Sequence, residues 1–208
     1  MELIRVGLFA SIHGDEPAGA HALVRLLEHL EKNPELAAGY QLFVYPVCNP
    51  TGYEDGTRHS RRGKDLNREF WRGSDETEVY LLEHELREHA FHGIISLHAD
   101  DTSDGVYGFA NGATLTESLL GPALRAAGKI LPLNQLEVID GFGAQNGIIR
   151  SGYPGMLTAP PARRIRPFEI TLETPAQAEL GLQVDAFVVA LKSILTQYRA
   201  FISHAQNI

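Results

Sequence analysis

The chain has 208 residues, of which 44% are hydrophobic and 21% charged, and its formal net charge is −8. This length and composition predict one globular domain, spanning residues 1–208, with a hydrophobic core of its own. The acidic balance argues against non-specific binding to nucleic acid, which needs a basic surface.

We find no sequence signal for export or for a membrane anchor, and therefore expect a cytoplasmic protein. The N-terminal residues Met1–Arg5 do not combine a basic region with a following apolar one, as a signal peptide would. No apolar run reaches about 18 residues, the length that a membrane span needs. Cys48 is the only cysteine, so no internal disulfide can form, and we expect a buried core thiol there.

The first third of the chain alternates strand and helix patterns. Residues Leu3–Ala10 are rich in apolar side chains and predict a buried strand. Pro17 suits a first helical position, and regularly spaced leucines then predict a helix that ends at Asn33-Pro34. Gln41–Val47 predicts the next strand.

A long ordered loop is expected at Asn49–Arg72, and loops of this length in compact domains are usually functional. Positive charge is concentrated in it, on Arg58, Arg61, Arg62, Lys64, Arg68 and Arg72. Such a cluster in an acidic protein suits a small anionic substrate. A basic loop that is merely solvated explains the charge equally well.

The next part of the chain resumes the alternation. Asp75–Glu78 resembles a capping box and predicts a helix that continues to about Ala90. Gly93–Leu97 predicts a third buried strand. The stretch Asp100–Gly152 is interrupted by many glycines, so its pattern predicts few elements.

Within that stretch we expect only a helix around Thr114–Ala127 and a short strand near Leu136–Ile139. Arg166–Leu172 predicts another central strand. The apolar spacing from Val184 to Tyr198 predicts a long amphipathic helix. Strands that alternate with helices predict an α/β fold, with a mixed, mostly parallel twisted sheet and helices on both faces.

Metal-ligating residue types follow two of the predicted strands. His13 and Glu16 come after the first strand, and His98 comes directly after the third. In open α/β sheets, ligands bind at the carboxyl ends of the strands. Catalytic zinc sites commonly use three protein ligands, two His and one Glu among them, and leave the fourth position to water. Taken singly, each residue is also explained as a core histidine or as a glutamate in a first helical turn.

These residues fall in an order that resembles the M14 family of zinc carboxypeptidases. The resemblance spans roughly residues 3–175 and is carried by His13–Glu16, Asn49–Tyr53, Arg58, Asp65–Arg68, His98 and Glu173. Gly56–Phe70 is most similar to the bacterial murein-peptide amidase branch. His13–Gly19 is equally similar to the succinylglutamate desuccinylase/aspartoacylase branch. The resemblance implies a zinc-carboxypeptidase-like fold.

The resemblance also implies one zinc ion per chain, held by His13, Glu16 and His98. Arg58 would polarise the scissile carbonyl and stabilise the oxyanion. Asn67 and Arg68 would bind the terminal carboxylate of the substrate. A guanidinium suits this task because it binds a carboxylate through two parallel bonds.

Glu173 would be the general base, and the family's active-site tyrosine would be Tyr153. Two alternatives stay open, because Glu169 has the spacing to share a strand face with Glu173, and Tyr107 could take the place of Tyr153.

We therefore expect a zinc-dependent hydrolase that cleaves an amide or peptide bond next to a free carboxylate, by a metal-activated water and a Glu base. The substrate would be a small peptide. The first alternative is an N-acyl amino acid deacylase of the desuccinylase/aspartoacylase type. The second alternative is a non-catalytic zinc-containing domain that binds a ligand. The oligomeric state is left open by the sequence.

Overall fold

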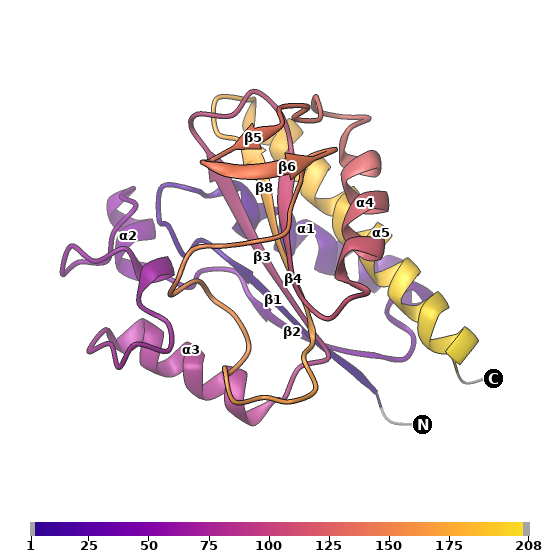
Figure 1. The fold of residues 1–208 in the computed structure, drawn as a ribbon, viewed down its shortest axis with the longest axis horizontal. Coiled ribbons are helices and arrows are strands. Elements are labelled where there is room, and N and C mark those ends of the chain that lie inside the picture. The colour runs from indigo at the N-terminus through magenta and orange to yellow at the C-terminus, as the bar shows by residue number, and fades with distance from the viewer. Residues whose placement is uncertain (1–2, 206–208) are drawn as a thin grey trace.

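The computed structural model describes residues 3–205, and a central twisted sheet dominates it (Figure 1). In chain order the elements are β1 (Ile4–Ala10), α1 (Ala18–Lys32), η1 (Pro34–Ala37), β2 (Tyr40–Tyr45), α2 (Pro50–Asp55), η2 (Leu66–Arg68), α3 (Thr77–Glu88), β3 (Gly93–Asp100), β4 (Tyr107–Gly112), α4 (Thr116–Ala127), β5 (Val138–Ile139), β6 (Phe142–Gln145), β7 (Ile148–Ile149), β8 (Phe168–Pro175) and α5 (Leu180–Ala205).

The strands of the described part form one sheet in the order β2-β1-β3-β8-β4-β7-β6-β5. The four strands from β2 to β8 run parallel, and β4 joins β8 in the antiparallel direction. Strand β7 is parallel to β4, and the short β5–β6 hairpin completes the far edge. The predicted fold class, a mixed and mostly parallel sheet, is therefore confirmed.

Helices cover both faces of the sheet, as predicted. Helices α1, α4 and α5 pack together on one face, and alternate strand residues such as Val6, Ile95 and Leu172 point into this layer. The other face carries α3 and the loops around it, against residues such as Phe9 and Ile94. Because both faces are buried, the central strands read as nearly continuous apolar runs.

Helix α5 is long and apolar enough to cross a membrane by length and composition, over Leu180–His204, and 50% of its most apolar window is buried. Its buried residues, which include Phe187, Leu191 and Ile194, lie in the same cluster as residues of α1 and α4. The length and hydropathy of α5 are therefore those of a core helix, which has to be apolar on the side that packs on the sheet and its neighbours.

Several predicted boundaries were wrong. Strands β3 and β8 were predicted to end at Leu97 and Leu172, but they remain paired through Asp100 and Pro175. The predicted loop at residues 49–72 contains two short helices, α2 and η2. The C-terminal helix is longer than predicted at both ends.

Strand β4 was missed, because Gly108 and Gly112 interrupt its apolar pattern. The structure explains Gly108, since a Cβ there would lie 2.7 Å from the carbonyl oxygen of Thr171 on β8. Glycine lets this strand approach its neighbour closely, a requirement that a propensity scale reads as a break.

Candidate metal centre and its cavity

His13, Glu16 and His98 meet at the carboxyl-end side of the sheet, and each of them is buried. The first two lie between β1 and α1, and His98 lies within β3. His13 Nδ1 is 2.6 Å from Glu16 Oε1, and His98 Nδ1 is 3.0 Å from Glu16 Oε2. The two Nδ1 atoms are 3.2 Å apart.

The glycine between the first two ligands is required by the packing. A Cβ at Gly14 would lie 1.9 Å from the backbone carbon of Gly52 and 2.2 Å from the nitrogen of Tyr53, in α2. Only glycine lets the His13–Glu16 segment pass so close to α2. Asn49 fixes that helix, because its side chain accepts a hydrogen bond from the backbone nitrogen of Gly52.

The donor set fits a divalent metal ion. The ligand atoms of His13, Glu16 and His98 lie within 4.8 Å of one another. Tetrahedral zinc with bonds of about 2.0–2.1 Å would separate its ligand atoms by roughly 3.3 Å, close to the separations seen here. Two imidazoles and one carboxylate are also a donor set found in catalytic zinc enzymes.

The charge states of the three residues are coupled. Burial alone would raise the pKa of Glu16, but the charge of His98 and the hydrogen bond to His13 outweigh it and lower this pKa to about 2. Burial works to lower the pKa of His13, but its hydrogen bonds to Asp65 and Glu16 raise it above the ordinary value. Burial lowers the pKa of His98. A neutral His98 and an ionised Glu16 are the forms that bind a metal.

Asp65 lies at the candidate metal site, although the sequence pattern predicted no role for it. Its Oδ1 lies 3.1 Å from His13 Nε2, and its Oδ2 accepts a hydrogen bond of 3.0 Å from Arg58 Nη2. A carboxylate behind a ligating histidine fixes the orientation and tautomer of the ring. The sequence did contain a signal, because Asp65 lies within the Asp65–Arg68 motif, but nothing local shows that it faces His13.

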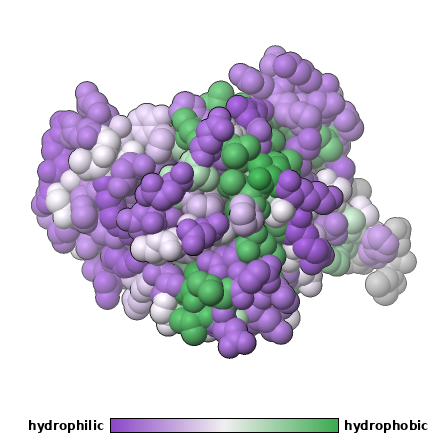
Figure 2. All heavy atoms as spheres, turned by 90° about the horizontal axis from the view of Figure 1, so that it is seen from above, coloured by the Kyte–Doolittle hydropathy of each residue, from purple (hydrophilic) through white to green (hydrophobic). Residues whose placement is uncertain are grey.

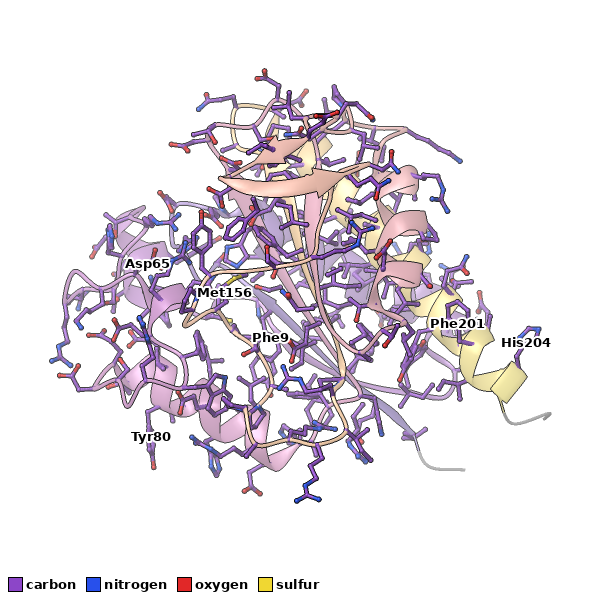
Figure 3. All side chains as sticks on the ribbon, viewed as in Figure 1. Phe9, Asp65, Tyr80, Met156, Phe201 and His204 are labelled. Carbon is purple, nitrogen blue, oxygen red and sulfur yellow. The ribbon has the colours of Figure 1, made fainter. Side chains whose placement is uncertain are left out.

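The ligands open into a cavity of about 240 Å³. Figure 3 shows the labelled Asp65 and Met156 in this region, between the β5–β6 hairpin above and α3 below. Seen from above, the molecule is hydrophilic at the left and right, with a band of hydrophobic residues between (Figure 2). The cavity is lined by His13, Glu16, Arg58, Asn67, Arg68, His98, Ala99, Asp100, Asp101, Thr102, Tyr107, Phe109, Asp140, Tyr153, Met156 and Glu173.

Glu173 stands beside the candidate metal ligands because of strand register. Residue His98 on β3 pairs with Glu173 on β8, and Glu173 pairs with Tyr107 on β4. These residues therefore form one row across three strands, and all three line the cavity. Burial, followed by the negative charges of Glu16 and Asp100, raises the pKa of Glu173 well above its ordinary value.

The predicted carboxylate-binding residues, Asn67 and Arg68, also line the cavity. Arg68 extends over the ring of Tyr153, with its guanidinium carbon 4.0 Å from the ring centre. Asn67 is buried, and its Oδ1 accepts a hydrogen bond of 2.9 Å from the backbone nitrogen of Leu157. The amide of Asn67 therefore also holds the loop that carries Tyr153. The Tyr153 hydroxyl donates to the carbonyl oxygen of Asp140 in the β5–β6 turn.

The two alternatives left open by the sequence are placed differently. Glu169 shares the strand face of Glu173, but its Oε1 accepts hydrogen bonds from Arg166 and from the nitrogen of Ala159. It does not line the cavity. Tyr107 does line the cavity, and its hydroxyl donates to Asp100 Oδ2 at 2.9 Å.

Five of the six basic residues of this loop fall into two groups, and the sixth, Arg72, donates a hydrogen bond to the carbonyl oxygen of Arg68. Arg58 and Arg68 line the cavity. Three others are exposed and form ion pairs with neighbouring acids, namely Arg61 with Glu54, Arg62 with Asp75 and Lys64 with Glu69. The solvated-loop interpretation therefore applies to these three, and the substrate-binding interpretation concerns only the first two.

Comparison with known proteins identifies both a family and a fold. Residues 2–181 match the profile of the succinylglutamate desuccinylase/aspartoacylase catalytic domain. No curated protein matches the chain. A protein of Shewanella amazonensis described as a metallopeptidase is 24% identical with a TM-score of 0.78, and the match covers 95% of this chain and 77% of that one.

Two metallo-carboxypeptidases have the same fold. The enzyme from Burkholderia cenocepacia is 15% identical with a TM-score of 0.74, and the match covers 96% of this chain and 58% of that chain. The enzyme from Pseudomonas aeruginosa, in complex with (2-guanidinoethylmercapto)succinic acid, is 18% identical with a TM-score of 0.66 and coverages of 95% and 58%. This chain thus spans little more than half the length of these two enzymes.

Proposed function

The chain belongs to the succinylglutamate desuccinylase/aspartoacylase catalytic-domain family, and from this premise we propose that it is a zinc-dependent hydrolase of small N-acyl amino acids. The family and its structural relatives make it a hydrolase of the carboxypeptidase or deacylase kind. Zinc, the amide bond of an N-acyl amino acid and the residue roles below are parts of the proposal.

The observation that carries the proposal is the composition of one cavity. It is lined by the buried triad of His13, Glu16 and His98, by Glu173 and by Arg68. A metal site next to a carboxylate that can act as a base is the arrangement for hydrolysis by an activated water. An arginine in the same cavity can bind the carboxylate of the substrate through two parallel bonds. A pure binding domain would have no need of Glu173.

In the proposed reaction, each of these residues would have a separate role. Arg68 binds the free carboxylate and so places the amide over the triad. Glu173 accepts a proton from the attacking water and later donates it to the leaving amine. Arg58 donates hydrogen bonds to the amide oxygen as negative charge develops there. A zinc ion at His13, Glu16 and His98 would polarise the amide carbonyl and lower the pKa of its water to about 7.

The size of the cavity favours an N-acyl amino acid over an extended peptide. A volume of about 240 Å³ is below the roughly 300–1,000 Å³ that is typical of pockets for drug-sized ligands. Tyr153 and the β5–β6 turn at Asp140 occupy part of its wall.

The second candidate is a metallocarboxypeptidase, which the shared fold of the Burkholderia and Pseudomonas enzymes favours. The succinic acid derivative bound to the Pseudomonas enzyme supports a small carboxylate as the substrate in either case. In a carboxypeptidase Arg68 would hold the C-terminal carboxylate of a peptide, and the other roles would not change.

Activity assays on the metal-loaded protein test the proposal. The substrates are N-acetyl-aspartate, N-succinyl-glutamate and a hippuryl-type peptide, each with and without prior removal of metal by a chelator. We expect hydrolysis of at least one N-acyl amino acid, loss of activity after chelation and recovery with zinc. Activity on the peptide alone would establish the second candidate. No hydrolysis of any substrate by zinc-loaded protein would favour the non-catalytic zinc-containing domain.

A further inference from the structure

The two histidines of the triad differ in the hydrogen-bond partner of Nε2, the ring nitrogen that faces away from Glu16. His13 Nε2 faces the carboxylate of Asp65 at 3.1 Å. His98 Nε2 faces a neutral group instead, the hydroxyl oxygen of Ser96 at 2.9 Å. Ser96 is only 3% exposed, and His98 is also 3% exposed. The contact between them is therefore shielded from water.

Strand geometry brings this pair together. Residues two apart on a strand point to the same face, so Ser96 stands directly below His98 on β3. Its neighbours in register are Phe9 on β1 and Thr171 on β8. The serine is thus fixed by paired strands on both sides.

The tautomer of His98 depends on this contact. A neutral imidazole carries one N–H, and its other nitrogen offers a lone pair. His98 Nδ1 points at His13 and Glu16, so it must be the nitrogen with the lone pair if it is to bind a metal. The hydrogen must then be on Nε2, where it needs an acceptor because an unpaired buried N–H is costly. The Ser96 Oγ can accept it.

We propose that Ser96 is a positioning residue, which holds His98 in the tautomer and ring orientation that present Nδ1 to the metal. The inference rests on the proposed function only in that it requires a metal at the triad. In this arrangement the two histidines have chemically different partners, the carboxylate of Asp65 for His13 and the hydroxyl of Ser96 for His98. A carboxylate partner makes the ligating ring more basic, whereas a hydroxyl orients the ring without adding a negative charge near the metal.

Metal affinity tests this role without any use of activity. The dissociation constant for zinc is measured by competition with a chromophoric chelator, and the cobalt(II)-loaded protein is examined by absorption spectroscopy. Ser96→Ala removes the acceptor and should raise the dissociation constant by about 10–100-fold, with a changed cobalt band. Ser96→Thr retains a hydroxyl and should restore the affinity to within a few-fold of wild type.

The matched control is Thr171→Val, which removes a buried hydroxyl from the neighbouring strand position on the same face. We expect this variant to bind metal as wild type does. If Ser96→Ala does not fold, as judged by circular dichroism, Ser96→Cys keeps the shape of the side chain and provides only a weak acceptor. It should then shift affinity in the same direction.

Wild-type affinity and an unchanged cobalt spectrum in folded Ser96→Ala would overturn the proposal, as would an equal loss in Thr171→Val. Wild-type protein that binds no metal would overturn both this inference and the proposed function. Tight metal binding without hydrolysis would count against the proposed function alone.

Discussion

Replacement of Glu173 by glutamine is the sharpest test of the proposed chemistry. Gln has the shape of Glu and one of its acceptor oxygens, but it cannot take a proton from water. Loss of a general base typically costs about 10²–10⁴-fold, or ~2.7–5.4 kcal/mol at 1.36 kcal/mol per tenfold. We expect Glu173→Gln to lower kcat toward the upper end of this range while zinc content is unchanged.

The upper end follows from Asp100 on β3 and Glu169 on β8, the other carboxylates of these two paired strands, which are poorly placed as replacements. Asp100 accepts hydrogen bonds from Tyr107 on one oxygen and from Thr102 on the other. Glu169 lies outside the cavity and is paired with Arg166. Neither can move to the row beside His98 without breaking these bonds.

The assay is steady-state hydrolysis of the best N-acyl amino acid, with metal analysis of each variant. Glu169→Gln is the matched control, and its kcat should remain within a few-fold of wild type provided that the protein folds. A kcat within a few-fold of wild type in Glu173→Gln would refute the assignment. A large loss in Glu169→Gln, with zinc and fold intact, would move the role of the base there.

Further outcomes follow from the same structure. Arg68→Lys should raise KM for carboxylate substrates by about 10-fold, since the two-pronged contact is lost, whereas Arg58→Ala should lower kcat by roughly 10²–10³-fold; steady-state kinetics would contradict this division if both variants changed only KM. Gly155→Ala should lower the melting temperature by several degrees, because φ is +83° there and a Cβ would lie 2.2 Å from the Arg68 oxygen; a positive φ alone costs about 1–2 kcal/mol, and an unchanged calorimetric melting temperature would refute this. Burial raises the pKa of Cys48 to about 12, so its thiol should resist alkylation at pH 8 until the protein unfolds, and rapid labelling of native protein would contradict this. Because only the unfolded thiol ionises just above about pH 8.5, the free energy of unfolding should not depend on this thiol below that pH and should fall as pH rises above it.

The features that the sequence predicted correctly were those marked by local residue patterns. Apolar runs marked β1 and β3 well enough to bring His13, Glu16 and His98 to one edge, and the structure places them within ligand distance of one another. The pattern could not tell where parallel strands stop pairing, since that depends on the neighbouring strand. His98 and Glu173 therefore looked like residues after strands, although both lie within them.

Contacts between segments that are distant in the chain could not be predicted from the sequence pattern. The role of Asp65 depends on a contact with a residue 52 positions away. Glu169 and Glu173 have the same residue type and the same strand face, and they differ in that Glu169 is bound by Arg166 and Ala159 whereas Glu173 lines the cavity. Strand β4 was missed because its glycines serve close packing against β8.

The place of β8 in the sheet has a consequence for how the site is assembled. Strand β8 lies between β3 and β4, yet it follows both of them in the chain. The candidate metal ligands come from β3 and from the segment between β1 and α1, which contact one another without β8. During refolding, zinc binding could thus be complete while β4 still lacks its partner and Glu173 is absent from the row. We expect recovery of zinc affinity to precede or accompany recovery of hydrolysis in stopped-flow experiments, and never to follow it.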